Sequence, residues 1–191
     1  DNFLSLSFDY DKRNQKFQTS QGFRNYFATD FPLVSETNTL ANTFIVTNYF
    51  EFLNNNVFKS SFYFKNSNSL TGDNIKLSER LYLPSNRLRG FESGKVGPKD
   101  GEDFIGGNYI SSMNFSSDIP KILENSQTTD LKIFLDVANV WGVDYDSSLE
   151  LSDDIKSAIG LGLDWYSPMG PMNFSLSQHL SKGSNDLTES F

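Results

Sequence analysis

Apolar and polar side chains alternate with a period of two along most of this chain. The clearest runs are FLSLSFDYD at residues 3–11, VFKSSFYFK at 57–65 and IKSAIGLGLDW at 155–165. Successive side chains of an extended strand point to opposite faces, so alternation over about ten residues indicates a strand with one apolar face. The chain is therefore predicted to be all-β, and its strands are predicted to pair in an antiparallel sheet.

Eight such strands can be placed along the sequence. They are expected at residues 3–12, 22–32, 41–53, 57–68, 106–117, 131–141, 154–166 and 171–180. The breaks between them contain Gly, Pro, Asn and Asp, which are the residues that turns require. Short turns at 54–56 and 167–171 alternate with longer polar connections at 33–40, 69–105 and 142–153.

Two architectures can use strands of this kind. A β-sandwich buries the apolar face against a second sheet, whereas an outer-membrane barrel turns it to lipid and has tight turns at one end and long loops at the other. Strand lengths near the roughly 9–11 residues that cross a bilayer, the alternation of short and long connections, and aromatic residues at strand ends favour the barrel. The two alternatives differ at Leu161 and Phe174, which a sandwich would bury and a barrel would expose to lipid.

Composition removes several classes of function. The chain has no cysteine and one histidine, so thiol chemistry and sites built from several histidines are excluded. A net charge of −8 argues against a nucleic-acid partner, which usually selects a basic face. The acidic residues Asp144, Asp146, Asp153 and Asp154 lack the spacing of a calcium loop, so we expect a solvated outer loop, no metal site and no cofactor.

Four motifs in the second half carry a resemblance to a known family. They are RLRGF at 87–91, GPKDGEDFIGGNYISSMNF at 97–115, IFLDVANVW at 133–141 and IKSAIGLGLDWYSPMGPMNFSLSQ at 155–178. In this order and spacing they closely resemble the C-terminal barrel of the outer-membrane assembly factors of the BamA family, within the outer-membrane insertase superfamily. The matching motif residues are Arg89, Gly90, Phe91, Gly106, Gly107, Trp141, Trp165, Pro168, Gly170 and Pro171.

The resemblance implies an up-and-down transmembrane β-barrel of bacterial surface antigen type. Residues 1–191 would form its C-terminal part, a partial barrel of about eight strands with a long inserted loop at 69–105. The periplasmic domains, the first strands and the final strand would lie outside this chain. The implied function is non-enzymatic: assembly and insertion of β-barrel proteins into the bacterial outer membrane. The implied partners are unfolded outer-membrane β-barrel proteins, the lipoproteins of an assembly complex and the lipid bilayer.

The resemblance also implies where the loop that carries the Arg-Gly-Phe motif lies in the barrel. In the family the long loop folds back into the barrel, which implies that Arg89 contacts the inner wall at Phe134 and Asp136. Alternation supports this independently, because Lys132, Phe134 and Asp136 share the face opposite the apolar one. A guanidinium can bind a carboxylate at two points while it stacks on an aromatic ring. Asn114 stands where the family often has a glutamate, so Asp136 is expected to be the single counter-charge.

Gly160 and Gly162 lie on the inner face of one strand and are expected to leave room for the inserted loop.

Alternative functions remain: a TamA-like translocation and assembly homologue, a two-partner secretion pore, or a secreted β-sandwich adhesin. The Gly-Gly-Asn, Val-Trp and Ser-Pro-x-Gly-Pro motifs favour the assembly factor over these relatives.

Overall fold

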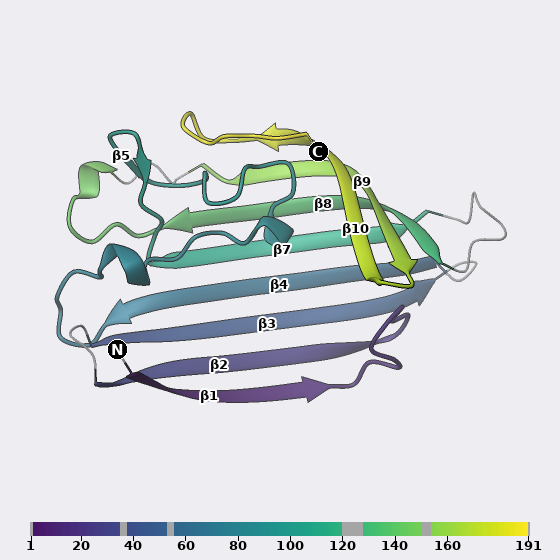
Figure 1. Cartoon of the computed structure of the whole chain (residues 1–191), viewed down its shortest axis with the longest axis horizontal. Coiled ribbons are helices and arrows are strands. Elements are labelled where there is room, and N and C mark those ends of the chain that lie inside the picture. The colour runs from purple at the N-terminus through teal and green to yellow at the C-terminus, as the bar shows by residue number, and fades with distance from the viewer. Residues whose placement is uncertain (1, 35–37, 53–55, 120–127, 150–153, 191) are drawn as a thin grey trace.

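Eight long strands form one antiparallel sheet. The computed structural model describes residues 2–34, 38–52, 56–119, 128–149 and 154–190. In sheet order the strands are β1 (Asn2–Asp11), β2 (Gly22–Val34), β3 (Thr39–Phe52), β4 (Asn56–Ser69), β7 (Tyr109–Asp118), β8 (Thr129–Trp141), β9 (Lys156–Ser167) and β10 (Gly170–Ser181). Each strand pairs with the one before it in this order, so the sheet is an up-and-down meander (Figure 1).

The eight predicted strands are all confirmed, most of them within two or three residues at each end. Two predicted boundaries are wrong. The long connection expected at 33–40 is shorter, because β2 continues to Val34 and β3 already begins at Thr39. The strand expected from residue 106 begins at Tyr109, because Gly107 pairs instead with Leu81 in an isolated bridge.

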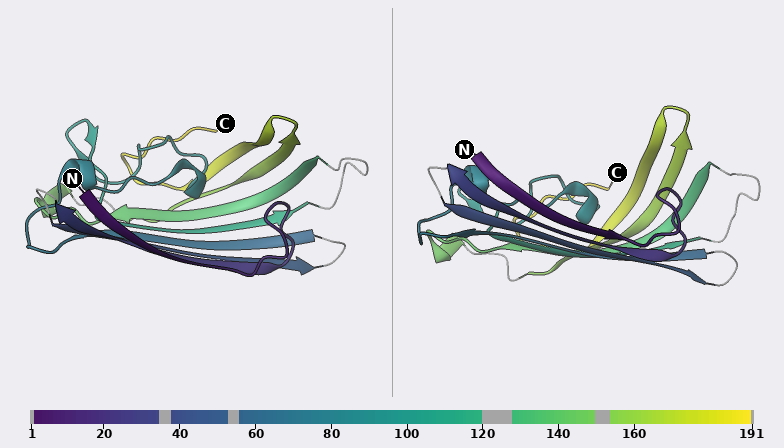
Figure 2. Two further views of the ribbon diagram at one scale, coloured as in Figure 1. Left: turned by 60° about the horizontal axis from the view of Figure 1, so that its bottom comes forward. Right: turned by 90° about the horizontal axis from the view of Figure 1, so that it is seen from below.

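The sheet curves into an open trough. Figure 2 shows the β9–β10 hairpin rising out of the plane of the other strands, and the segment that joins β4 to β7 lying on the concave side. That segment, residues 70–108, is called the inserted loop below. It contains short 3₁₀ turns at Leu77–Glu79 and Ser85–Arg87 and a small hairpin, β5 (Lys99–Asp100) with β6 (Asp103–Phe104).

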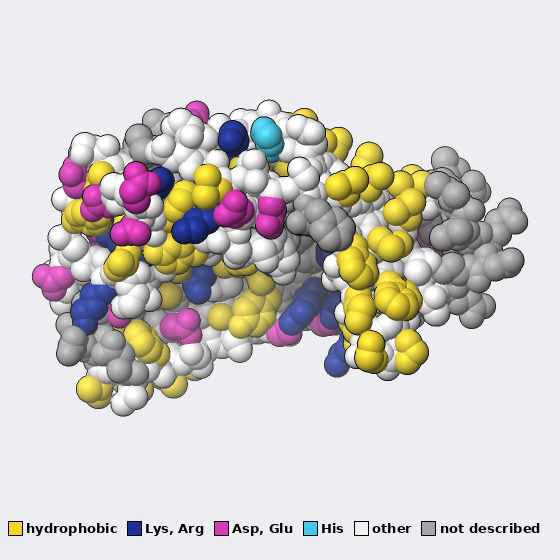
Figure 3. All heavy atoms as spheres, turned by 45° about the horizontal axis from the view of Figure 1, so that its top comes forward, with side chains coloured by type: hydrophobic (Ala, Val, Ile, Leu, Met, Phe, Trp, Pro, Cys, Tyr) yellow, Lys and Arg dark blue, Asp and Glu magenta, His cyan; other side chains and the backbone are white. Residues whose placement is uncertain are grey.

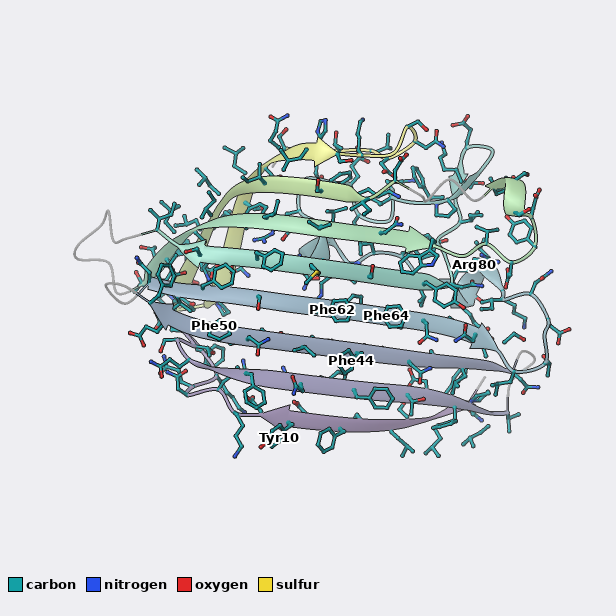
Figure 4. The ribbon with its side chains drawn as sticks, turned by 180° about the vertical axis from the view of Figure 1, so that it is seen from behind. Tyr10, Phe44, Phe50, Phe62, Phe64 and Arg80 are labelled. Atoms are coloured by element: carbon teal, nitrogen blue, oxygen red, sulfur yellow. The ribbon has the colours of Figure 1, made fainter. Side chains whose placement is uncertain are left out.

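The convex face is apolar and open. Figure 4 shows Phe44, Phe50, Phe62 and Phe64 on this face, and Leu161 and Phe174 are 46% and 43% exposed. These exposures are those of a barrel and contradict a sandwich, which would cover the face with a second sheet. No helix in the described part of the chain is long and apolar enough to cross a membrane.

The buried core lies on the concave side, between the inserted loop and the inner wall. The loop contributes half of the core cluster and four strands contribute the rest; its members are Tyr63, Leu81, Leu83, Leu88, Phe91, Val96, Ile110, Ala138, Val140 and Ala158. Near the loop the inner face is apolar, because small and aliphatic side chains of β7, β8 and β9 pack against the loop.

Candidate functional site

Arg89 binds the carboxylate of Asp136 on the inner face of β8. Its guanidinium donates from Nε to Oδ2 over 2.7 Å and from Nη2 to Oδ1 over 2.8 Å, which is the two-point geometry of a planar fork. The backbone amide of Arg89 donates to Oδ2 as well, over 3.1 Å. Asp136 is fully buried, so the loop supplies both the counter-charge and the hydrogen bonds that a buried carboxylate needs.

The Phe134 ring lies beneath the same guanidinium. The Arg89 Cζ atom is 3.5 Å from the ring centroid, within the range of a cation–π contact. Room for the ring comes from β9, because a Cβ atom on Gly160 would lie 2.5 Å from Phe134 Cζ. At Gly162 a Cβ would meet Phe134 Cδ1 at 3.8 Å and Arg89 Nη1 at 3.9 Å, which is ordinary van der Waals contact. Gly160 therefore makes room for the ring, whereas the space at Gly162 does not require glycine.

Asn114 of β7 joins the loop to Asp136. Its Nδ2 group donates to Asp136 Oδ1 and to the backbone carbonyl of Arg87, each over 2.8 Å. A carboxylate at this position could donate neither bond and would face a second negative charge. The amide thus supports the single carboxylate through these two hydrogen bonds.

Gly90 and Phe91 continue the loop against the wall and against the segment after β10. Gly90 has φ +88°, and a Cβ there would lie 2.8 Å from Ser177 Oγ, so glycine is required by both conformation and space. Phe91 is buried and pairs with Thr188 in an antiparallel bridge. Backbone hydrogen bonds run from Glu189 to Gly90 and from Glu92 to Leu187, over 3.1 and 3.0 Å.

The Gly106-Gly107 pair closes the loop at its far end. Gly107 exchanges two backbone hydrogen bonds with Leu81, over 2.8 and 3.0 Å. A Cβ on Gly107 would lie 2.3 Å from the Trp141 carbonyl, which explains why the motif needs glycine beside the last residue of β8. The Trp141 ring itself stacks on Tyr109, with ring centroids 5.7 Å apart.

A second ion pair fastens the beginning of the inserted loop, near the mouth of the trough, and the sequence analysis did not predict it. Arg80, almost fully buried, pairs with Asp144 of the β8–β9 connection. Asp144 also accepts hydrogen bonds from the Ile75 amide over 2.9 Å and from Asn108 Nδ2 over 3.1 Å. Burial by itself would raise the pKa of Asp144, but these hydrogen bonds and the charge of Arg80 outweigh it and lower that pKa.

This network corrects the view of the acidic residues as a solvated outer loop. Asp146 fits that view, since it is exposed and accepts hydrogen bonds from Ser148. Asp144 is exposed as well, but it is not only solvated, because it also ties two loops together. Asp153 lies outside the described residues, and Asp154 is exposed. Within the described ranges, no group of three or more His, Cys, Asp or Glu side chains could hold a metal ion.

The Trp-x-Ser-Pro-x-Gly-Pro motif lies away from the loop, at the opposite ends of β9 and β10. Pro168 and Met169 form a two-residue turn between the paired residues Ser167 and Gly170. Ser167 Oγ donates to the Gly170 carbonyl over 2.7 Å, and Gly170 has φ +128°. Pro171 opposes Tyr166 and Trp165 is 40% exposed, so this motif shapes a tight turn and contacts none of the docking residues.

The structure thus brings Arg89, Gly90, Phe134, Asp136 and Asn114 into one cluster. Sequence reasoning missed three contributors: Arg87 and Leu88 of the same motif, and the segment 186–189. Leu88 is 1% exposed, and its place between two arginines was the one available signal that it packs inward. The segment after β10 carried no motif, and its pairing with residues 90–95 is decided by long-range contacts.

Comparisons with known proteins show the family and the fold of this chain. Outer membrane protein assembly factor BamA of Neorickettsia risticii (strain Illinois) is 29% identical over 119 residues, covering 61% of this chain and 16% of the relative. The protein of the same name from Nitratidesulfovibrio vulgaris is 31% identical over 114 residues, covering 57% of this chain and 14% of the relative. The chain therefore spans only about a sixth of the length of these relatives.

The fold is also found in a solved structure. The crystal structure of BamA from Haemophilus ducreyi lacking POTRA domains 1–3 superimposes with a TM-score of 0.91 at 22% identity. The match covers 100% of this chain and 41% of the other. A sequence profile described as the Omp85 superfamily domain matches residues 1–191. Family and barrel fold together place the chain in the bacterial outer membrane, and the chain belongs to the Omp85 superfamily.

Proposed function

We propose that this chain acts in the assembly and insertion of β-barrel proteins into the outer membrane, without enzymatic chemistry. The curated relatives that it matches carry the name of an outer membrane protein assembly factor. Its partners would be unfolded outer-membrane β-barrel proteins, the lipoproteins of an assembly complex and the surrounding lipid. The observation that carries the proposal is the inserted loop, fastened to the inner wall by Arg89 and Asp136.

We also propose that the chain forms the C-terminal part of a longer barrel. Support comes from the solved relative, whose structure is matched over the whole of this chain but over 41% of its own length. Residues 1–191 would then be one wall of the barrel together with its inserted loop. Periplasmic domains and the remaining strands would be supplied by other parts of the protein.

The docked loop gives the wall a mechanical role. A barrel that inserts other barrels has to expose backbone hydrogen-bonding groups to an incoming strand, which then adds to the sheet edge by β-augmentation. Such an edge can open and close in a controlled way only if the wall beside it keeps its curvature. The loop ties β7, β8 and the segment after β10 together, so it braces three elements at once.

The test is a charge-reversal cycle in the full-length protein: Arg89→Glu, Asp136→Arg and the double variant. Each single variant leaves a charge without its partner in a largely buried place, which destabilises by about 3–5 kcal/mol. We expect each single variant to lower the heat-stability of the barrel and the insertion of a substrate barrel into lipid vesicles. The double variant restores the opposite charges, so we expect it to recover a large part of both.

The control is Arg24→Glu, which removes an exposed ion pair with Asp9 on the same inner face. Exposed pairs contribute about 0–1 kcal/mol, so this variant should insert substrate nearly as well as the wild type. If neither Arg89→Glu nor Asp136→Arg changes insertion, the loop has no part in the activity and the proposal fails. A protein that exports a soluble partner through its pore, without inserting barrels, would instead be a secretion pore.

A further inference from the structure

A cavity of about 710 Å³ lies between the inserted loop and the inner wall. Although the chain as a whole has a net charge of −8, six of its cationic side chains line this cavity. In Figure 3, dark-blue Lys and Arg side chains lie along the hollowed part of this face, with magenta carboxylates among them. The six are Arg13, Arg24, Lys59, Arg87, Arg89 and Lys132.

Four of the six cations have a carboxylate partner. Arg13 pairs with Asp11, Arg24 with Asp9, Arg89 with Asp136 and Lys132 with Asp164. Lys59 and Arg87 have no such partner among the described residues, although Glu189 also lines the cavity. Two positive charges on the wall of one cavity are therefore left without a counter-charge by this part of the chain.

Asp136 cannot serve Arg87 as it serves Arg89. Its two oxygens already accept four hydrogen bonds, three from Arg89 and one from Asn114. An ionised carboxylate has about four acceptor positions, so Asp136 is saturated. Arg87 instead donates one guanidinium N–H to Ser61 Oγ over 3.1 Å and lies over the Tyr63 ring, with Cζ 4.7 Å from its centroid.

Arg87 remains charged in this place, even though burial lowers the pKa of its guanidinium. Its other N–H groups have no protein acceptor in the described ranges. They are not sealed off either, because Arg87 is half-exposed and lines the cavity. The donors therefore point to a ligand or to solvent within the cavity.

Lys59 faces the same space from β4. Its ammonium group lies 5.8 Å from the Tyr49 ring centroid, and it has no hydrogen-bond acceptor among the described residues. Lys59 and Ser61 are two apart on one strand, so they share a face at a spacing of about 7 Å. Because Ser61 holds Arg87, the ammonium and the guanidinium converge on one region, and the hydroxyl-bearing Ser116 stands opposite Lys59 on β7.

We propose that this cavity binds an oxyanion of the phosphate class between Lys59 and Arg87. A tetrahedral oxyanion offers several acceptors, so it can take bonds from a guanidinium fork, an ammonium and a neighbouring hydroxyl at the same time. Free phosphate and the phosphate of a lipid headgroup share this chemistry. The site shares its cavity with Arg89 but uses the donors of Lys59 and Arg87 that the Arg89–Asp136 ion pair leaves unused, and it does not depend on the insertion activity proposed above.

The test uses the full-length protein in non-ionic detergent and a chloride buffer. Inorganic phosphate is titrated and its binding is followed by calorimetry and by the ³¹P resonance. We expect saturable binding of modest affinity, with a dissociation constant on the order of 1 mM. A second arm replaces phosphate by micelles doped with phosphatidic acid; binding in this arm alone would assign the site to a lipid headgroup.

The variants are Lys59→Gln and Arg87→Gln, each expected to weaken binding about tenfold or more, because each removes a charged hydrogen-bond donor. Lys59→Arg keeps the charge and should keep most of the affinity. Lys65→Gln is the matched control, since Lys65 is on the same strand and face but outside the cavity lining. Trypsin resistance of the loop reports whether the loop remains docked in each variant.

The outcomes separate clearly. The proposal is overturned if the wild type binds neither phosphate nor phosphatidic acid. It is also overturned if Lys59→Gln, with its loop still resistant to trypsin, binds as tightly as the wild type. Equal weakening by Lys65→Gln would show non-specific attraction to a positive surface, which contradicts a built site. Loss of phosphate binding in Lys59→Gln, with its loop still resistant to trypsin and with Lys65→Gln unaffected, establishes the site independently of the proposed function.

Discussion

Asp136 shows how one residue can decide where a long loop lies. A carboxylate on the inner wall of a barrel is acceptable when it faces water, but this one is fully buried beneath the loop. Its burial is offset by a guanidinium, a backbone amide and a side-chain amide, which together fill its acceptor positions. The backbone amide matters most for position, because it fixes the main chain of the loop as well as one side chain.

Gly90 gives a prediction at this scale. Gly90→Ala adds a Cβ against Ser177 and also forces a non-glycine residue to adopt φ +88°. The backbone conformation alone is worth about 1–2 kcal/mol, and the contact at 2.8 Å adds to it. We expect the loop to become sensitive to trypsin, and the unfolding temperature of the barrel to fall.

Gly94→Ala is the matched control for this variant. Gly94 has a positive φ of +72°, but no atom lies within 4 Å of the Cβ that alanine would add. It should therefore show the backbone effect alone, and Ser177→Gly should partly rescue Gly90→Ala by removing the contact. Equal effects of Gly90→Ala and Gly94→Ala, without rescue, would mean that the close approach to β10 has no energetic importance.

The inserted loop is fastened to the rest of the protein at three separate places. Arg89 fastens it in the interior, residues 187–189 pair with it beside β10, and Arg80 ties its beginning to Asp144 near the mouth. Between these points the loop buries Leu81, Leu83 and Leu88 against the wall. An element of 39 residues (70–108) with little regular structure can be ordered because hydrophobic burial and these fastenings offset its conformational entropy.

The clamp near the mouth predicts a dependence on pH. The pKa of Asp144 is lower in the folded protein than its ordinary value of 3.8, so the clamp stabilises fully above that value. This stability is lost as the pH falls below 3.8 through the folded pKa, because protonation of Asp144 leaves Arg80 without its counter-charge. Thermal unfolding followed from neutral pH to about pH 3 should show this loss.

Asp144→Asn identifies the group responsible. The variant should be less stable at neutral pH by about 3 kcal/mol, because the nearly buried Arg80 charge loses its partner. It should also lose the part of the acid sensitivity that Asp144 contributes. Asp146→Asn serves as the control, since Asp146 is exposed and its side chain accepts hydrogen bonds from Ser148 but makes no ion pair with another residue in the described ranges. An unchanged acid profile in Asp144→Asn would rule out the clamp as its cause.

At the scale of the whole molecule, the usual arrangement of a soluble protein is reversed. Large apolar side chains cover the convex face and are open, while the buried core lies on the concave side under the inserted loop. Such a surface is stable when hydrocarbon replaces water on the outside, because no hydrophobic surface then remains in contact with water. The sheet and its loop are therefore one unit whose stability depends on a bilayer around it.

Phe44 and Thr43 test this arrangement, because they are adjacent in β3 and point to opposite faces. Phe44→Asp places a charge on the lipid-facing side, which should destabilise the barrel in vesicles by roughly 1–3 kcal/mol. Thr43→Asp faces the lumen opposite Lys65 and should change stability little. Phe44→Leu separates the charge from the loss of the ring contact with Phe62, and heat-modifiability on gels is the measurement. Greater damage by Thr43→Asp would reverse the assignment of the two faces.

Much of this structure could be predicted from local patterns. The period of two places eight strands and assigns their two faces, because the pleat of a strand forces successive side chains apart. The contact of the Arg-Gly-Phe loop with β8 was predicted from the resemblance to the family, and the alternation around Asp136 supported it. The signal for the strands is local, whereas the motif by itself does not show where the loop lies.

Only the tertiary structure decided the rest. Three features join segments far apart in the chain: the pairing of Gly107 with Leu81, the Arg80–Asp144 clamp and the placement of residues 186–189. The apolar half of the inner wall also had no local signal, because Ala138, Val140 and Ala158 become a core only when the loop covers them. The sequence by itself determined the strands and their faces, because those follow from backbone geometry. The tertiary structure decided which segments meet, because that depends on which long-range contacts can be satisfied together.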